Sequence, residues 1–180
     1  MLTITIPESE QWDEVNEEYI YTKAQTLQLE HSLVSLSKWE SKWCKPFLSS
    51  NDKSLEETID YVKCMTITPN VDQNVYRCLS NENIEEINKY IAAPMTATWF
   101  SEDKVSRPNR EIVTAEIIYY WMIALNIPFE CQKWHLNRLL TLIRVCDKKS
   151  QPPKKMGKNE IMSRNAVLNA ARRKRYGSKG

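Results

Sequence analysis

The stretch EIVTAEIIYYWMIALNIPFECQKWHLNRLLTLIRVC, residues 111–146, decides the fold class. Its first part, 112–125, is apolar at 12 of 14 positions, which is too continuous for a helix with one solvated face. We therefore expect a helix that is buried on all sides. Asn126 and Pro128 end this helix, and Pro128 suits the first turn of a second helix over 128–149. The first helix is shorter than the roughly 20 residues of a membrane span, so we expect no membrane association.

The two helices are predicted to form the centre of the core. The second one carries a stripe of apolar side chains at helical spacing, namely Phe129, Leu136, Leu139, Ile143 and Cys146. We expect Trp39, Trp43 and a helix over 55–65 to pack against the pair. Trp121 and Leu139 are predicted to be buried there.

Cys131 and His135 raise the question of catalysis or metal binding, because they stand four residues apart in the second predicted helix. A zinc site needs three or four ligands, and a nucleophilic thiolate needs a base and an oxyanion site. The second histidine, His31, lies far away in sequence, and no third ligand is apparent. We interpret the pair as part of a helix–helix contact and expect no catalytic residue, no metal and no cofactor.

The rest of the chain alternates between short strand and helix patterns. Residues 2–6 (LTITI) and 26–30 (TLQLE) alternate as strands do and are predicted to pair as a small hairpin. The acidic stretch between them is expected to form a loop or a short helix. Helical periodicity follows over 32–43, 54–65, 82–91 and 159–176, and Ser54 with Glu57 forms a capping box at the start of the second of these helices. The sequence thus predicts a mainly α (α+β) protein.

Composition excludes several classes of protein. Three glycines in 180 residues and the absence of any Gly-rich phosphate motif argue against a nucleotide-binding fold. The N-terminus has neither a basic region nor an apolar stretch, so no signal peptide is expected and the chain is predicted to be intracellular. Five cysteines without a C-x-x-C pair are then interpreted as buried thiols.

Charge divides the chain into two parts. Residues 148–180 hold 11 Lys or Arg and one acid, whereas residues 1–147 hold 14 basic and 22 acidic residues. We therefore predict one helical domain over 1–149 and a basic C-terminal arm over 150–180. The arm is expected to be a helix with a short apolar stripe, and it is the predicted partner-binding element through Ile161, Arg164, Leu168, Arg172, Arg173, Lys174 and Arg175.

The basic arm permits more than one partner. It could neutralise nucleic-acid phosphates, dock on an acidic or helical protein, or remain a solvated tail. The segment SKWESKWCKPF (37–47) alternates Trp with Lys, as some single-strand-binding surfaces do, but Leu33 and Leu36 continue its apolar stripe, which favours a core helix. The chain contains no base-reading motif, which disfavours sequence-specific binding of nucleic acid and leaves non-specific binding open. Nucleic acid is therefore the less favoured partner.

A family resemblance rests on five stretches, which are SKWESKWCKPFL, TIDYVKCMTI, YIAAPMTATWF, EIVTAEIIYYWMIALNIPFECQKWHLNRLLTLIRVC and PPKKMGKNEIMSRNAVLNAARRKRYG. Together they resemble small proteins of long-tailed (siphovirus-type) bacteriophages, and in particular the tail assembly chaperones encoded just before the tape measure protein. The resemblance covers most of residues 33–176, and none of the stretches is a chemical motif.

The resemblance implies a helical, non-catalytic protein of the host cell cytoplasm. Such a chaperone would bind the tape measure protein, recruit the tail tube protein and be absent from the mature virion, and self-association stays open. Two alternatives remain at this stage. The chain could be a structural virion protein, such as a minor tail or connector component, or a nucleic-acid-binding protein acting through the basic arm.

Overall fold

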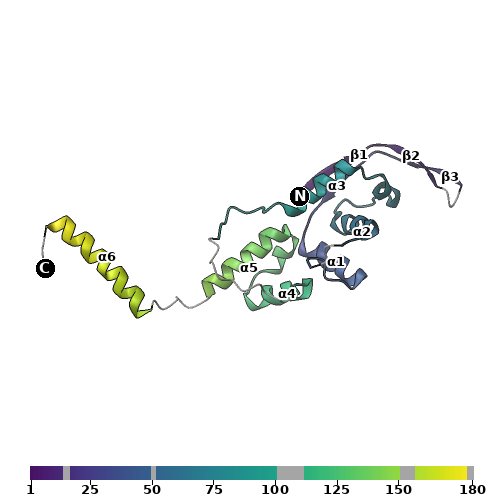
Figure 1. The fold of residues 1–180 in the computed structure, drawn as a ribbon. Coiled ribbons are helices and arrows are strands. Elements are labelled where there is room, and N and C mark those ends of the chain that lie inside the picture. The colour runs from purple at the N-terminus through teal and green to yellow at the C-terminus, as the bar shows by residue number, and fades with distance from the viewer. Residues whose placement is uncertain (14–16, 50–51, 101–111, 151–156, 178–180) are drawn as a thin grey trace. The chain divides into compact units, whose positions relative to one another are not determined.

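The computed structural model describes the chain except for residues 14–16, 50–51, 101–111, 151–156 and 178–180 (Figure 1). Two compact units divide the chain, Met1–Asp147, which we call the body, and Lys148–Gly180. The fold is mainly α with a small antiparallel β-structure at the N-terminus, which confirms the predicted fold class. The helices are α1 (Leu33–Trp43), α2 (Leu55–Met65), α3 (Asn81–Ala92), α4 (Ala115–Ala124), α5 (Leu136–Ser150) and α6 (Lys158–Tyr176), with 3₁₀ segments η1 (Gln73–Cys78) and η2 (Phe129–Lys133).

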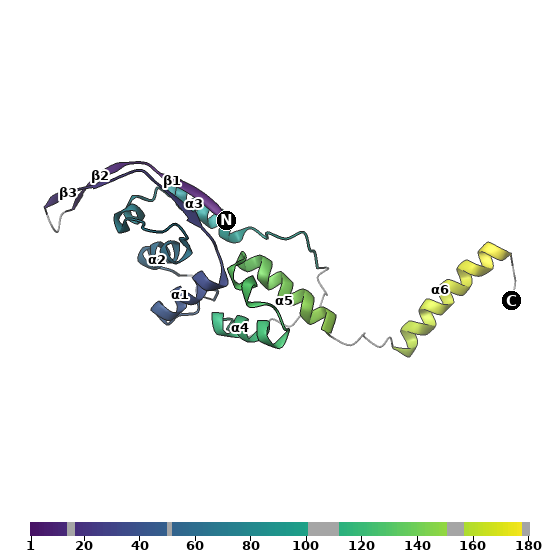
Figure 2. The same ribbon diagram turned by 180° about the vertical axis from the view of Figure 1, so that it is seen from behind.

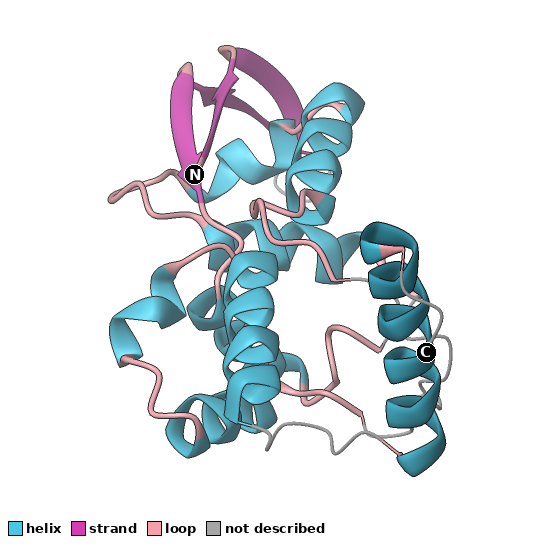
Figure 3. Cartoon of the chain, turned by 90° about the vertical axis from the view of Figure 1, so that its left-hand side faces the viewer, coloured by secondary structure: helices cyan, strands magenta, loops and turns pink. Residues whose placement is uncertain are grey.

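The N-terminal hairpin is longer than predicted. Strand β1 (Leu2–Ile6) pairs antiparallel with β4 (Gln25–Leu29), as expected. Between them, β2 (Ser9–Asp13) pairs with β3 (Glu18–Thr22), so the expected loop or short helix is wrong. Trp12 stands two residues after Glu10, and Tyr21 two residues after Tyr19, so these residues share one face of the ladder. This strand-like spacing outweighs the low β-propensity of the acidic residues. Figure 3 shows the strands gathered at one end of the body.

The inner face of the β1–β4 ladder enters the core. Ile4, Ile6, Leu27 and Leu29 are all buried, since alternate residues of a strand point to one face. The backbone of β4 also pairs on its other side with the chain that follows α2, where Ile67 N–H donates to the carbonyl of Gln28 at 2.8 Å. The hairpin is therefore held to the helices by both packing and hydrogen bonds.

Local signals explain where three of the helices begin. Ser32, Ser54 and Ser80 each cap a helix, and each forms a reciprocal capping box with the residue three positions later. The predicted box of Ser54 and Glu57 is confirmed. These caps satisfy backbone N–H groups that the first helical turn leaves unpaired.

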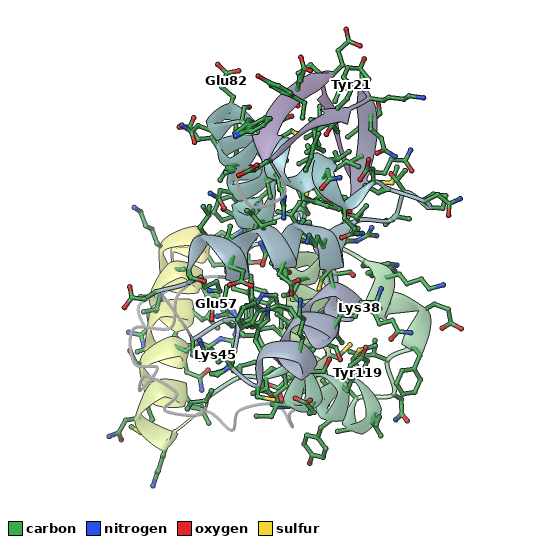
Figure 4. All side chains as sticks on the ribbon, turned by 90° about the vertical axis from the view of Figure 1, so that its right-hand side faces the viewer. Tyr21, Lys38, Lys45, Glu57, Glu82 and Tyr119 are labelled. Carbon is green, nitrogen blue, oxygen red and sulfur yellow. The ribbon has the colours of Figure 1, made fainter. Side chains whose placement is uncertain are left out.

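Helix α1 lies at the centre of the helical layer, where it contacts α2, α4 and η2. Trp39 is fully buried, and its indole N–H donates to the carbonyl oxygen of Glu57 at 2.9 Å. Trp43 is only half-buried, and its indole N–H donates to Asp60 Oδ2 at 2.9 Å. The core interpretation of this stretch is thus right for Trp39, which offers no surface for stacking on a nucleic-acid base. Figure 4 shows Lys45 and Glu57, which form an ion pair at the edge of the same contact.

Helix α4 is not buried on all sides, contrary to expectation. Ala115, Ile118 and Met122 are buried, whereas the side chains of Tyr120 and Ile123 are 66% and 61% exposed. The buried residues recur three and four positions apart, because α4 lies on the other helices along one face only. Trp121 is accordingly half-buried, while Leu139 of α5 is fully buried as predicted. The apolar run therefore supplies both a core face and an exposed apolar face.

A buried carboxylate fixes where α4 begins. Glu40, on α1, is 7% exposed, and its Oε2 accepts the backbone N–H of Ala115 at 2.7 Å. Its Oε1 accepts the backbone N–H of Phe47 at 2.8 Å. Thr114, at the N-cap of α4, makes no side-chain cap of its own. Glu40 therefore takes the role of the missing cap, and its negative charge suits the positive end of the helix dipole.

Replacing Glu40 with Ala should destabilise the body by about 2–4 kcal/mol, because two buried N–H groups lose their acceptor. Urea unfolding followed by circular dichroism measures this change. Glu86→Ala, at an exposed position of α3, is the matched control and should change the free energy of unfolding by less than about 0.5 kcal/mol. Equal losses in the two variants would contradict the capping role.

Candidate binding surface

The Cys131–His135 pair is not one turn of an α-helix. Cys131 lies in the 3₁₀ segment η2, and Trp134 after it is extended, with φ −72° and ψ 162°. Helix α5 begins only at Leu136, so the predicted continuous helix over 128–149 is wrong. Pro128 starts a short 3₁₀ turn here instead of a long helix. The side chain of Cys131 is buried, as the thiol interpretation expected. The interpretation is wrong for Cys44, which is exposed, and the other three cysteines are only partly buried.

His135 instead contacts His31, which lies far away in sequence. The two ring centroids are 5.1 Å apart in an edge-to-face arrangement. A 2.6 Å hydrogen bond joins His31 Nδ1 to the Tyr61 hydroxyl, and a 3.0 Å hydrogen bond joins His135 Nε2 to the carbonyl oxygen of Tyr90. The backbone N–H of Leu136 donates to the carbonyl oxygen of His31 at 2.7 Å. The cluster connects the end of the hairpin to the start of α5.

Burial keeps both imidazoles neutral. It lowers the pKa of His31 to about 4, and the neighbouring His135 lowers it further in the same direction. Burial also lowers the pKa of His135. Among the residues that the structure describes, no group of three or more His, Cys, Asp or Glu side chains could hold a metal ion. The arrangement therefore works as a polar contact inside the core.

The predicted partner-binding residues all lie on α6, a helix of 19 residues. Every one of them is exposed. Helical spacing divides them into two sets, since residues three or four apart share a face. One face presents Ile161, Arg164, Leu168, Arg172 and Arg175, which we call the α6 face. Arg173 and Lys174 point away from it.

The ends of α6 explain its charge distribution. Gly157 is its N-cap and makes no side-chain hydrogen bond, whereas Gly177 ends it with φ 63°, a left-handed conformation that suits glycine. Arg173, Lys174 and Arg175 lie in the last turn, where cations complement the partial negative charge of the helix end. The helix thus has a basic C-terminal end as well as the α6 face.

The body carries a second surface that the sequence did not single out. Helices α4 and α5 lie side by side in both Figure 1 and Figure 2. A groove between them, the α4–α5 groove, has apolar walls and two charged residues, and it is lined by Trp121, Ala124, Leu125, Leu140, Ile143, Arg144 and Asp147. A helix with a narrow apolar stripe fits such a groove. The signal in the sequence was the excess of apolar residues over what one buried face of α4 needs.

Comparison with protein families, with characterised proteins and with solved structures gave no match. None of the helices in the described part of the chain is long and apolar enough to cross a membrane.

The buried histidines predict that the body loses stability in mild acid. The pKa of His31 is about 4 in the folded body and 6.5 in the unfolded chain, so the unfolded chain binds the extra proton first. Stability should be complete above pH 6.5 and should fall as the pH drops toward about 4, by about 2 kcal/mol between pH 7 and pH 5. Urea unfolding at the two pH values tests this, with His31→Gln as the comparison. The same fall in the Gln variant would show that His31 is not the cause.

Proposed function

We propose that the protein is a non-catalytic bacteriophage tail assembly chaperone that binds the tape measure protein and helps recruit tail tube protein. The family resemblance supports this role, and one structural observation carries it: α6 exposes a continuous face of aliphatic and Arg side chains along a helix of 19 residues. Such a face suits a long helical client. The work of the protein would take place in the host cell cytoplasm.

The α6 face would bind its client by helix-to-helix packing. Ile161 and Leu168 are each 44% exposed and would cover apolar side chains of the client. Arg164, Arg172 and Arg175 flank them and would meet client carboxylates, which speeds encounter and fixes the register. The apolar stripe is too short to hold α6 in place by itself. Binding would therefore depend on both the apolar contacts and the pairing of Arg with carboxylates.

The α4–α5 groove offers a second place for the same client. Ile143 is buried in it and Leu140 is half-buried, while Arg144 and Asp147 supply one charge of each sign. One apolar side chain of a client helix could enter between Trp121 and Leu140. The groove becomes the principal client site if α6 proves dispensable.

Truncation after Ser150, where α5 ends, separates the two surfaces. The truncated chain should keep its cooperative unfolding, because α6 contributes no residue to the core cluster. Co-expressed tape measure protein should then precipitate, although it stays soluble with the full chain. Solubility of the client is measured as its fraction in the supernatant.

Point variants test whether the α6 face itself binds the client. Ile161→Asp with Leu168→Asp should imitate the truncation, whereas Ala166→Asp, on another face of α6, should keep the client in solution. A client that stays soluble with the truncated chain would move the binding site to the α4–α5 groove, and Leu140→Asp would then be the deciding variant. A client that precipitates even with the full chain contradicts the proposed function.

The two alternative functions have readouts of their own. Mass spectrometry of purified particles should find no copies of a chaperone, whereas stoichiometric copies would identify a structural virion protein.

The run of four basic residues at 172–175 favours nucleic-acid binding as the other candidate. Filter binding to DNA at increasing salt tests it, since phosphate neutralisation gives a steep loss of affinity with salt. No retention at about 50 mM salt removes this candidate.

A further inference from the structure

The outer part of the hairpin exposes three aromatic rings on one face. Trp12, Tyr19 and Tyr21 are 51%, 67% and 58% exposed. Trp12 is the cross-strand partner of Tyr19, and their ring centroids lie 4.9 Å apart. Tyr21 follows two residues later and so shares their face. Figure 1 shows β2 and β3 extending beyond the helices of the body, and Figure 4 shows Tyr21 at that end.

At the Ser9–Thr22 end of the same ladder, the opposite face lies against the body. Thr22 is 1% exposed, and the hydroxyl of Ser9 donates to the sulfur of Cys78 at 3.0 Å. Strand β3 contacts η1, which carries that cysteine. The hairpin thus packs on the body at this end, and its aromatic face is exposed to solvent.

Two carboxylates, those of Glu8 and Glu10, lie beside the ring of Tyr21. Residues 8–18 contain six acidic residues and no Lys or Arg. The Tyr21 hydroxyl donates to Glu8 Oε2 at 2.8 Å, and this hydrogen bond raises the pKa of Tyr21. Glu10 is the cross-strand partner of Tyr21. Aromatic faces beside carboxylates are suited to guanidinium groups, which stack on rings and pair with carboxylates in the same geometry.

The chain itself carries a segment of the matching chemistry. The α6 face places Arg164, Arg172 and Arg175 around two aliphatic side chains. Arg164 and Arg175 are about 16 Å apart along the helix axis at 1.5 Å per residue. Glu8, the residue before β2, and Trp12 are about 13 Å apart along an extended chain at 3.3 Å per residue. The cationic part of the α6 face and the hairpin face are therefore of similar length and of opposite charge.

We propose that the outer hairpin face, formed by Glu8, Glu10, Trp12, Tyr19 and Tyr21, binds the α6 face of a second copy of this chain. Guanidinium groups would lie against the rings of Trp12 and Tyr19, and Glu8 and Glu10 would accept their N–H groups. Each copy offers one surface of each kind, so the contact is heterologous and joins copies in a head-to-tail series or a ring. The contact does not depend on the proposed client.

Sedimentation velocity of the full chain over a range of concentrations tests the proposal. We expect association that weakens as salt is raised, because exposed charges are screened. Trp12→Ser with Tyr19→Ser (the hairpin variant) and Arg172→Gln with Arg175→Gln (the arm variant) should each reduce the association constant at least 10-fold. Arg173→Gln with Lys174→Gln removes the same charge from outside the α6 face and should change it less than about 3-fold. Circular dichroism and urea unfolding confirm that each variant is folded.

Mixing the variants gives the decisive observation. The hairpin variant keeps its α6 face and the arm variant keeps its hairpin face, so together they should form a 1:1 complex that grows no further. Three results overturn the proposal. The first is a wild-type chain that stays monomeric at every concentration, as it would if α6 bound its own hairpin. The others are a mixture of variants that forms no complex and a control pair that weakens association as much as the arm variant.

Discussion

The position of α4 against α1 depends on one buried carboxylate. Glu40 reaches from α1 to the backbone of Phe47 and to the first residue of α4, two segments far apart in sequence. The chain arrives at α4 after the segment 101–111, and Thr114 provides no cap, so the helix has no local signal that fixes its start. A carboxylate held between two N–H groups supplies that signal from another helix. The location of the α4–α5 groove follows from it.

The sequence predicts the elements whose causes are local. The capping box of Ser54 and Glu57, the alternation in β1 and β4 and the periodicity of α1 to α3 act over a few residues, and those elements were found. The contacts of Glu40 with Ala115 and of His31 with His135 join segments that are distant in sequence. The local sequence around these residues does not predict them. The complete burial predicted for the apolar run before Asn126 was wrong for a related reason. Composition measures how apolar a helix is, whereas the neighbouring helices decide how many of its faces they cover.

The candidate surfaces were predictable to different degrees. Helical spacing alone separates Ile161, Leu168 and Arg172 from Arg173 and Lys174, so the α6 face could have been defined from the sequence. The outer hairpin face was missed because six carboxylates made residues 8–18 resemble a loop. The available signal was the two-residue spacing of Glu10 and Trp12 and of Tyr19 and Tyr21, which places each pair on one face of a strand. For the α4–α5 groove, the apolar excess of α4 indicates an exposed apolar face, but the location of the groove depends on the placement of two helices and could not have been predicted.

The two proposals assign one face of α6 to two partners, and this has a consequence for regulation. A face that binds the hairpin of a second copy is covered when no client is present, which keeps Ile161 and Leu168 out of water. A client helix must then compete with self-association, so its apparent affinity falls as the concentration of the chain rises. The hairpin face supplies only carboxylates and rings, whereas a long client supplies aliphatic side chains over the whole length of α6. The client therefore displaces the second copy when its apolar contact outweighs the aromatic contacts of one short hairpin.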